Sequence, residues 1–69
     1  MKLEEYRKQL GLSQSELARL SGLTYVTISK AESGKPIAGA TARAICKALS
    51  KELNRTVQIS DIEGLNVRV

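Results

Sequence analysis

The chain has 69 residues, of which 42% are hydrophobic and 3% aromatic, and its formal net charge is +4. This length is expected to form one small domain over residues 1–69, with a limited and mostly aliphatic core. A single cysteine, the absence of histidine and the lack of a long apolar run exclude a disulfide framework, a histidine-based catalytic triad, a transition-metal site and a membrane span.

The first expected element is a short N-terminal helix that ends at Gly11. Apolar side chains recur at i, i+3 and i+7 in Leu3, Tyr6 and Leu10, and this spacing defines an inward stripe. Arg7 falls on the same stripe. Because a partly buried charge needs a partner, Arg7 is expected to pair with an acidic residue.

A second helix is predicted to begin at Gln14. Ser13 and Glu16 have the S-x-x-E spacing of a capping box, in which each side chain accepts a backbone N–H of the other residue. Gly22 follows with the conformational freedom that a sharp turn needs. The inward face of this helix is predicted to consist of Leu17, Ala18, Leu20 and Ser21.

A third helix is predicted over residues 25–33, so that helix, turn and helix together occupy residues 13–33. Thr24 is its candidate N-cap. Gly34 is expected to take a left-handed conformation after the last turn, and Pro36 prevents the helix from continuing.

The inward side of this third helix carries a second unusual charge. At roughly 100° per residue, Thr24, Ala31 and Glu32 lie on the same side as Ile28. We predict that Glu32 forms an ion pair with Arg7, which would tie the first helix to the third. The alternative is that both side chains reach solvent.

The outward side of the third helix has the chemistry of a DNA-reading surface. Val26 and Lys30 point away from the core, and Tyr25, Thr27 and Ser29 flank them. Valine can pack on a thymine methyl group, lysine can donate to guanine, and hydroxyl groups can bond bases or phosphates. This side therefore suits the major groove of duplex DNA.

A fourth helix is predicted over residues 39–53. Its inward stripe consists of Ala42, Ile45, Cys46, Leu49 and Leu53. Cys46 lies within that stripe, and we interpret it as a small buried hydrophobe rather than a nucleophile. Lys35 and Arg43 are expected to reach phosphates if the start of this helix lies near a duplex.

In the tail, residues 57–69, the pattern of apolar residues differs from that of the preceding helices. The spacing of Ser60 and Glu63 predicts a short fifth helix. Apolar residues alternate with polar ones around it, at Val57, Ile59, Leu65, Val67 and Val69. This alternation favours an extended strand, which either pairs with a second copy across a two-fold axis or packs back on its own domain. Residues 57–69 are therefore a candidate dimerisation segment.

The segment from residue 12 to residue 35 resembles the helix-turn-helix of the phage repressor and Cro family, also called the XRE family. The matching elements are Q-x-E-L-A from Gln14, the turn residue Gly22, the inward Ile28, and E-x-G-K from Glu32. The resemblance implies a lambda repressor-like fold. We therefore expect an all-α protein, a compact bundle of four to five helices, with one candidate β-strand at the C-terminus.

The resemblance also implies roles for single residues. In that family the second helix of the pair lies in the major groove, which implies base contacts from Tyr25, Val26, Thr27 and Lys30. It implies phosphate contacts from Gln14, Thr24, Ser29 and Lys35. It implies the Arg7–Glu32 ion pair as well. Family members often have glutamine or asparagine where this chain has Tyr25 and Val26.

The expected function is sequence-specific binding of double-stranded DNA by a transcriptional regulator, namely a dimeric repressor of a pseudo-palindromic operator. The resemblance implies a cytoplasmic, nucleoid-associated protein of bacterial or phage origin. Neither a cofactor nor an enzymatic activity is expected, since no histidine could activate Cys46. Two alternatives remain open: an antitoxin that binds both DNA and its toxin, and a protein-interaction module on the same fold.

Overall fold

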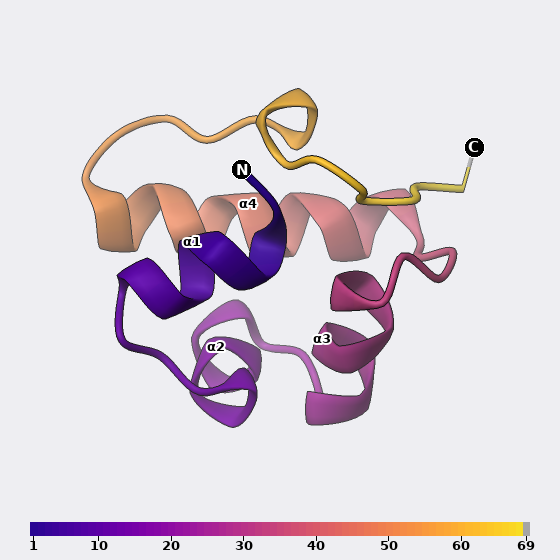
Figure 1. The fold of residues 1–69 in the computed structure, drawn as a ribbon, viewed down its shortest axis with the longest axis horizontal. Helices are drawn as coiled ribbons and strands as arrows, with labels where there is room; N and C mark the ends of the chain where they lie inside the picture. The colour runs from indigo at the N-terminus through magenta and orange to yellow at the C-terminus, as the bar shows by residue number, and fades with distance from the viewer. Residues whose placement is uncertain (69) are drawn as a thin grey trace.

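The computed structural model describes residues 1–68, and four α-helices make up most of that range (Figure 1). They are α1 (Leu3–Gln9), α2 (Gln14–Ser21), α3 (Tyr25–Glu32) and α4 (Gly39–Leu53), followed by a single 3-10 turn, η1 (Ile59–Asp61). The helices α2 and α3 pack against each other, α2 packs on α4, and α1 contacts α3. The predicted all-α fold with a helix-turn-helix is confirmed.

The start of α2 follows directly from its capping box. The backbone N–H of Glu16 donates to Ser13 Oγ at 3.1 Å, and the backbone N–H of Ser13 donates to Glu16 Oε1 at 2.9 Å. The hydrogen bond from the Ser13 backbone lowers the pKa of the Glu16 carboxyl. At the other end, Gly22 has φ = 71°, a left-handed conformation that favours glycine and turns the chain toward α3.

Both ends of α3 are also set by local sequence. Thr24 Oγ1 accepts the backbone N–H of Thr27 at 3.3 Å. Beyond the last turn, Lys35 N–H donates to the carbonyl of Lys30 at 3.0 Å, and Gly34 N–H donates to that of Ala31 at 3.3 Å. This is a Schellman motif, and the φ of 81° at Gly34 allows it. The helix consequently ends at Glu32, one residue before its predicted end.

One hydrophobic core joins the four helices. The largest fully buried side chains are Leu17 from α2, Ile28 from α3, and Ile45 and Leu49 from α4. Cys46 is buried in the same cluster, and burial raises the pKa of its thiol. The α4 bounds agree with the predicted helix, residues 39–53.

Two of the predicted inward positions are wrong. Leu20 is exposed, because it lies roughly 110° around the helix axis from the direction shared by the other three residues of the predicted face. Thr24 is also exposed. As the N-cap it precedes the first helical turn, so the helical wheel does not describe its direction.

The predicted fifth helix is wrong in its cap and its extent. The structure has only the 3-10 turn η1, and Asp61 caps it by accepting the backbone N–H of Gln58 at 2.9 Å. Glu63 does not cap this turn, and its backbone N–H donates instead to the carbonyl of Met1 at 3.0 Å. The S-x-x-E spacing at Ser60 therefore does not start a helix.

The tail packs back on its own chain in the structure. The backbone N–H of Ile37 donates to the Asn66 carbonyl, and the Arg68 N–H donates to the Ile37 carbonyl, each at 2.8 Å. Leu65 and Val67 are half-buried against the core, as the alternation predicts. The pairing amounts to isolated bridges rather than a strand. The predicted alternation also includes Val69, which lies outside the described residues.

None of the helices within residues 1–68 is both long enough and apolar enough to cross a membrane.

Candidate nucleic-acid interface

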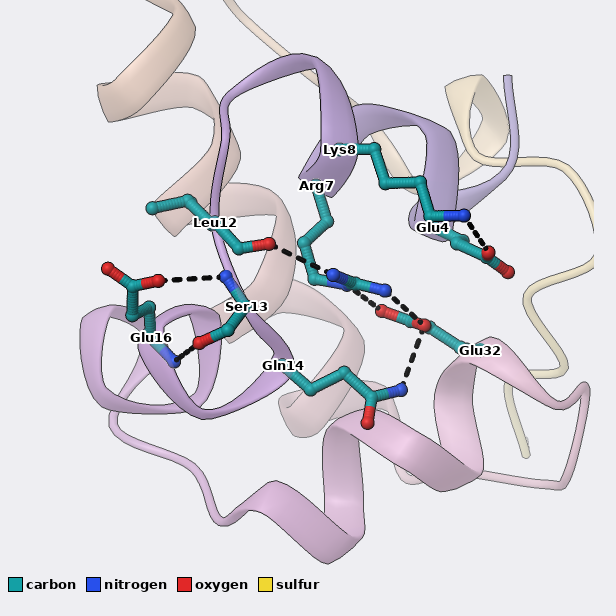
Figure 2. A network of polar contacts seen from close by, with 8 residues as sticks. All are labelled: Glu4, Arg7, Lys8, Leu12, Ser13, Gln14, Glu16 and Glu32. Carbon is teal, nitrogen blue, oxygen red and sulfur yellow. Dashed lines mark hydrogen bonds and ion pairs between the residues drawn. The ribbon is translucent and has the colours of Figure 1, made fainter.

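A partly buried ion pair holds α3 against α1 (Figure 2). Arg7 Nε donates to Glu32 Oε2 at 2.6 Å, and Arg7 Nη2 donates to Glu32 Oε1 at 3.2 Å. The two side chains are only 13% and 7% exposed. The hydrogen bond to Glu32 raises the pKa of Arg7. This fork geometry fixes the guanidinium and carboxylate planes relative to each other, and so orients α3 on α1.

The same arginine also holds the loop between α1 and α2. Arg7 Nη1 donates to the carbonyl oxygen of Leu12 at 2.9 Å (Figure 2). Leu12 stands two residues before the first residue of α2. One side chain therefore contacts α3 and the entry to α2, which are the two parts of the helix-turn-helix that must keep a fixed geometry.

Gln14 belongs to this network, which the sequence analysis missed. Its Nε2 donates to Glu32 Oε1 at 2.9 Å, while the amide oxygen points away from the ion pair (Figure 2). The side chain is half-buried at the first position of α2. Glu32 thus fixes the direction of the Gln14 amide. The spacing of the two residues along the chain gives no sign of this contact.

The two sides of α3 differ sharply in exposure. Ile28 is 0% exposed, whereas Tyr25 is 54% and Val26 is 57% exposed. Lys30 is exposed as well, and Thr27 is half-buried. Large apolar side chains that are left in solvent next to a cation mark this side of α3 as a candidate binding surface.

The hydroxyl groups near the start of α3 are already hydrogen-bonded to one another. Thr24 Oγ1 lies 2.9 Å from Thr27 Oγ1, and each oxygen keeps capacity for a further bond. Ser29 is half-buried on the helix, and Lys35 is exposed in the loop after it. These residues surround the outward face of α3 without forming a closed pocket on it.

The charge of this region is strongly biased. Glu32 is the only acidic residue between Leu17 and Lys51, and its carboxylate is turned inward to Arg7 and Gln14. The basic residues of the same stretch that remain exposed are Arg19, Lys30, Lys35, Arg43, Lys47 and Lys51. The exposed side of α3 and the loop after it therefore present the positive charges of Lys30 and Lys35 without an exposed carboxylate on the same segment, as a polyanion-binding surface requires.

Comparison with known protein families agrees with this geometry. The model of the helix-turn-helix family matches residues 3–55, which span all four α-helices. The chain belongs to the XRE family of helix-turn-helix proteins. These are DNA-binding regulators of transcription. No curated protein and no solved structure is significantly similar to the chain.

The XRE-family match leaves out the tail. Residues 56–69 follow the matched region, yet Asn66 and Arg68 are hydrogen-bonded to Ile37, in the loop between α3 and α4. The Asn66 side chain adds a bond from its Nδ2 to the Gly34 carbonyl at 3.4 Å. A segment outside the family pattern thus lies beside the C-terminal end of α3.

Within residues 1–68, no three histidine, cysteine, aspartate or glutamate side chains are grouped closely enough to hold a metal ion.

Proposed function

We propose that this XRE-family protein is a sequence-specific repressor that binds duplex DNA with α3 in the major groove. The observation that supports this proposal most directly is that Glu32 points inward and forms an ion pair with Arg7. It removes the only carboxylate of the region from the surface and leaves the exposed side of α3 apolar and basic. Such a face can approach base edges and phosphates without electrostatic repulsion.

Base contacts are assigned to the outward residues of α3. Lys30 donates to guanine O6 and N7, and Val26 packs against a thymine methyl group. Tyr25 supplies an exposed ring and hydroxyl at the N-terminal end of the helix, where a recognition helix meets base edges. Thr27 stands next to this group and adds a hydroxyl.

Phosphate contacts are assigned to residues around this face. Gln14 is held at the start of α2 by Glu32, so its amide oxygen and second amide hydrogen are presented in a fixed direction. Thr24, Ser29 and Lys35 stand at the start, middle and end of the α3 region. Such contacts position the protein on the duplex, whereas base contacts select the sequence.

A dimer would explain how so small a reading surface selects an operator. Two copies related by a two-fold axis would place their α3 helices about one DNA turn apart, roughly 34 Å, and would prefer a pseudo-palindrome. Doubling the number of contacted base pairs multiplies the discrimination that each copy achieves.

The deciding experiment is selection of bound duplexes from a random DNA library at near-physiological salt. The expected result is enrichment of a symmetric motif whose half-sites are one helical turn apart. Enrichment of an asymmetric motif would retain DNA binding but refute the dimer. No enrichment, with no salt-dependent binding to any duplex, would refute the proposed function.

Replacing Lys30 by alanine should weaken binding to the enriched motif by about 1–3 kcal/mol and relax the preference at one base pair of each half-site. The matched control is Lys51→Ala, which removes the same charge from the last turn of α4. Titration of fluorescent duplexes that carry each base at every half-site position measures both effects. If Lys30→Ala retains the affinity and the preference of the native protein, the assignment of the reading face is wrong.

Recognition of a protein is the second candidate function, and the exposure of Tyr25 and Val26 favours it. An exposed aromatic ring next to a β-branched side chain also suits a protein interface. A toxin would be one such partner, in which case the chain is an antitoxin. A toxin gene next to the gene of this chain, and co-purification of the two products, would support this function.

A further inference from the structure

We infer that the tail supplies Arg68 as an additional DNA-contacting residue, which forms a phosphate-binding site together with Lys30 and Thr41. The site lies between the C-terminal half of α3, the following loop and the first turn of α4. This inference rests on the proposed function, because it names a contact within the same DNA-binding surface. It concerns a residue that lies outside the family match.

The first support is the shape of the surface at this point. A cavity of about 150 Å³ is lined by Lys30 and Thr27 of α3, by Thr41 of α4, by the loop around Ile37 and by Arg68. The cavity is an open hollow at the surface, so a polar group larger than a water molecule can enter it from solvent. Its polar lining consists of cations and hydroxyl groups, which are hydrogen-bond donors that suit a phosphate oxygen.

The second support is the charge of that cavity. Lys30 and Arg68 line it together, and no acidic side chain does. The ion pairs within residues 1–68 join Arg7 to Glu32, Lys8 to Glu4, and the N-terminal amine to Glu63, so none of them involves these two cations. The two positive charges in this cavity repel each other, and an anion between them would be attracted to both.

The third support is that the tail holds Arg68 in place through its backbone. The Arg68 N–H donates to the Ile37 carbonyl, and the Asn66 carbonyl accepts from the Ile37 N–H, each at 2.8 Å. Val67 packs close to Gly39, so that a Cβ at Gly39 would meet Val67 Cγ1 at 4.0 Å. The Arg68 side chain itself is exposed and makes none of these contacts. Among residues 1–68 no ion pair or hydrogen bond holds this side chain, so it can bind an anion, while the backbone before it is anchored beside α3.

Duplex DNA is the source of the phosphate that the position of the cavity favours. Lys30 belongs both to the outward face of α3 and to the lining of the cavity. A phosphate in the cavity would thus be adjacent to the base that Lys30 reads. Contacts of this kind fix the register of a recognition helix in the groove.

The experiment measures how binding depends on salt. Each phosphate contact contributes a slope of about −0.9 to the logarithm of the binding constant plotted against the logarithm of salt concentration. The probe is a fluorescent duplex of mixed sequence, about two helical turns long. The proteins are the full chain and its variants Arg68→Ala, Arg68→Lys and Lys51→Ala. Thermal unfolding of each variant is recorded in parallel.

For Arg68→Ala, the expected slope is shallower by about 0.9 than that of the native chain. If the two proteins bind equally at 1 M salt, the variant then binds roughly eightfold more weakly than the native chain at 0.1 M salt. Arg68→Lys should keep most of the slope, because it keeps the charge. Lys51→Ala should keep all of it, since Lys51 stands in the last turn of α4, whereas Thr41, which lines the cavity, stands in the first turn. The melting temperature of Arg68→Ala should equal that of the native chain.

Four outcomes would overturn the inference. If Arg68→Ala retains the native slope while the native chain binds DNA, the inference fails and the proposed function stands. If Lys51→Ala loses as much slope as Arg68→Ala, the effect is one of net charge and no site exists. If Arg68→Ala keeps its slope but loses mass in light scattering, the cavity is an interface between copies. A native chain that binds no duplex refutes the proposed function, and this inference with it.

Discussion

Replacing Arg7 by alanine should lower the free energy of unfolding by about 3 kcal/mol. The substitution leaves Glu32 largely buried, at 7% exposure, without its cationic partner. An uncompensated buried carboxylate is costly because it has lost its hydration without gaining a counter-charge. The Leu12 carbonyl and the start of α2 lose their contact with Arg7 Nη1 at the same time.

The size of this effect is large relative to the whole protein. A chain of this length has a total stability of roughly 3.5–10 kcal/mol. A loss of about 3 kcal/mol would therefore populate the unfolded state noticeably near physiological temperature. Urea unfolding followed by circular dichroism measures the loss, as a lower midpoint with an unchanged slope.

The control for Arg7 is its neighbour, Lys8. Lys8 Nζ lies 2.7 Å from Glu4 Oε1, so Lys8 also forms an ion pair on α1. The side chains of both Lys8 and Glu4, however, are exposed to solvent. Exposed pairs at this helical spacing contribute little to stability, because water and salt screen the two charges. Lys8→Ala should thus shift the midpoint slightly. Equal effects of the two substitutions would mean that burial of the Arg7–Glu32 pair has no energetic consequence.

The parts of the fold that could be predicted from sequence are those that local interactions determine. Ser13 and Glu16 lie three residues apart, and their capping box fixes the start of α2 wherever the helix packs. The left-handed Gly34 likewise ends α3 through contacts within two turns. The inward positions of Ile28 and Leu49 follow from helical periodicity. None of these depends on how distant segments meet.

The parts that could not be predicted depend on contacts between distant segments. Gln14 turns toward Glu32 because α2 and α3 pack side by side, and no spacing rule relates two residues on different helices. Arg68 lines the cavity beside Lys30 because Ile37 pairs with Val67 of the tail. A 3-10 turn capped by Asp61 replaces the predicted helix, because the following residues pair with the N-terminus, where the Glu63 backbone N–H donates to the Met1 carbonyl. Local propensity is overridden in each case by a tertiary contact.

The geometry of α3 separates stability from recognition, and paired substitutions on its two sides should show this. Ile28→Ala should cost about 2–5 kcal/mol of stability, because it removes three carbons from a fully buried site and leaves a cavity. Val26→Ala, two residues away and 57% exposed, should change stability by no more than about 0.5 kcal/mol. Thermal unfolding of the two variants under the same conditions measures both effects.

DNA binding should respond in the opposite order. At a temperature where both variants are folded, Val26→Ala should weaken binding to the enriched duplex and relax the preference for thymine at its base pair, because the methyl contact is lost. Folded Ile28→Ala should keep the native base preference, since Ile28 faces the core and not the groove. Ile28→Ala would then lose stability but keep its base preference, and Val26→Ala would lose base preference but keep its stability. This result would mean that one face of α3 stabilises the fold and the other reads DNA. If Val26→Ala destabilised the protein as much as Ile28→Ala, the outward side of α3 would be buried in solution, and a reading face there would be impossible.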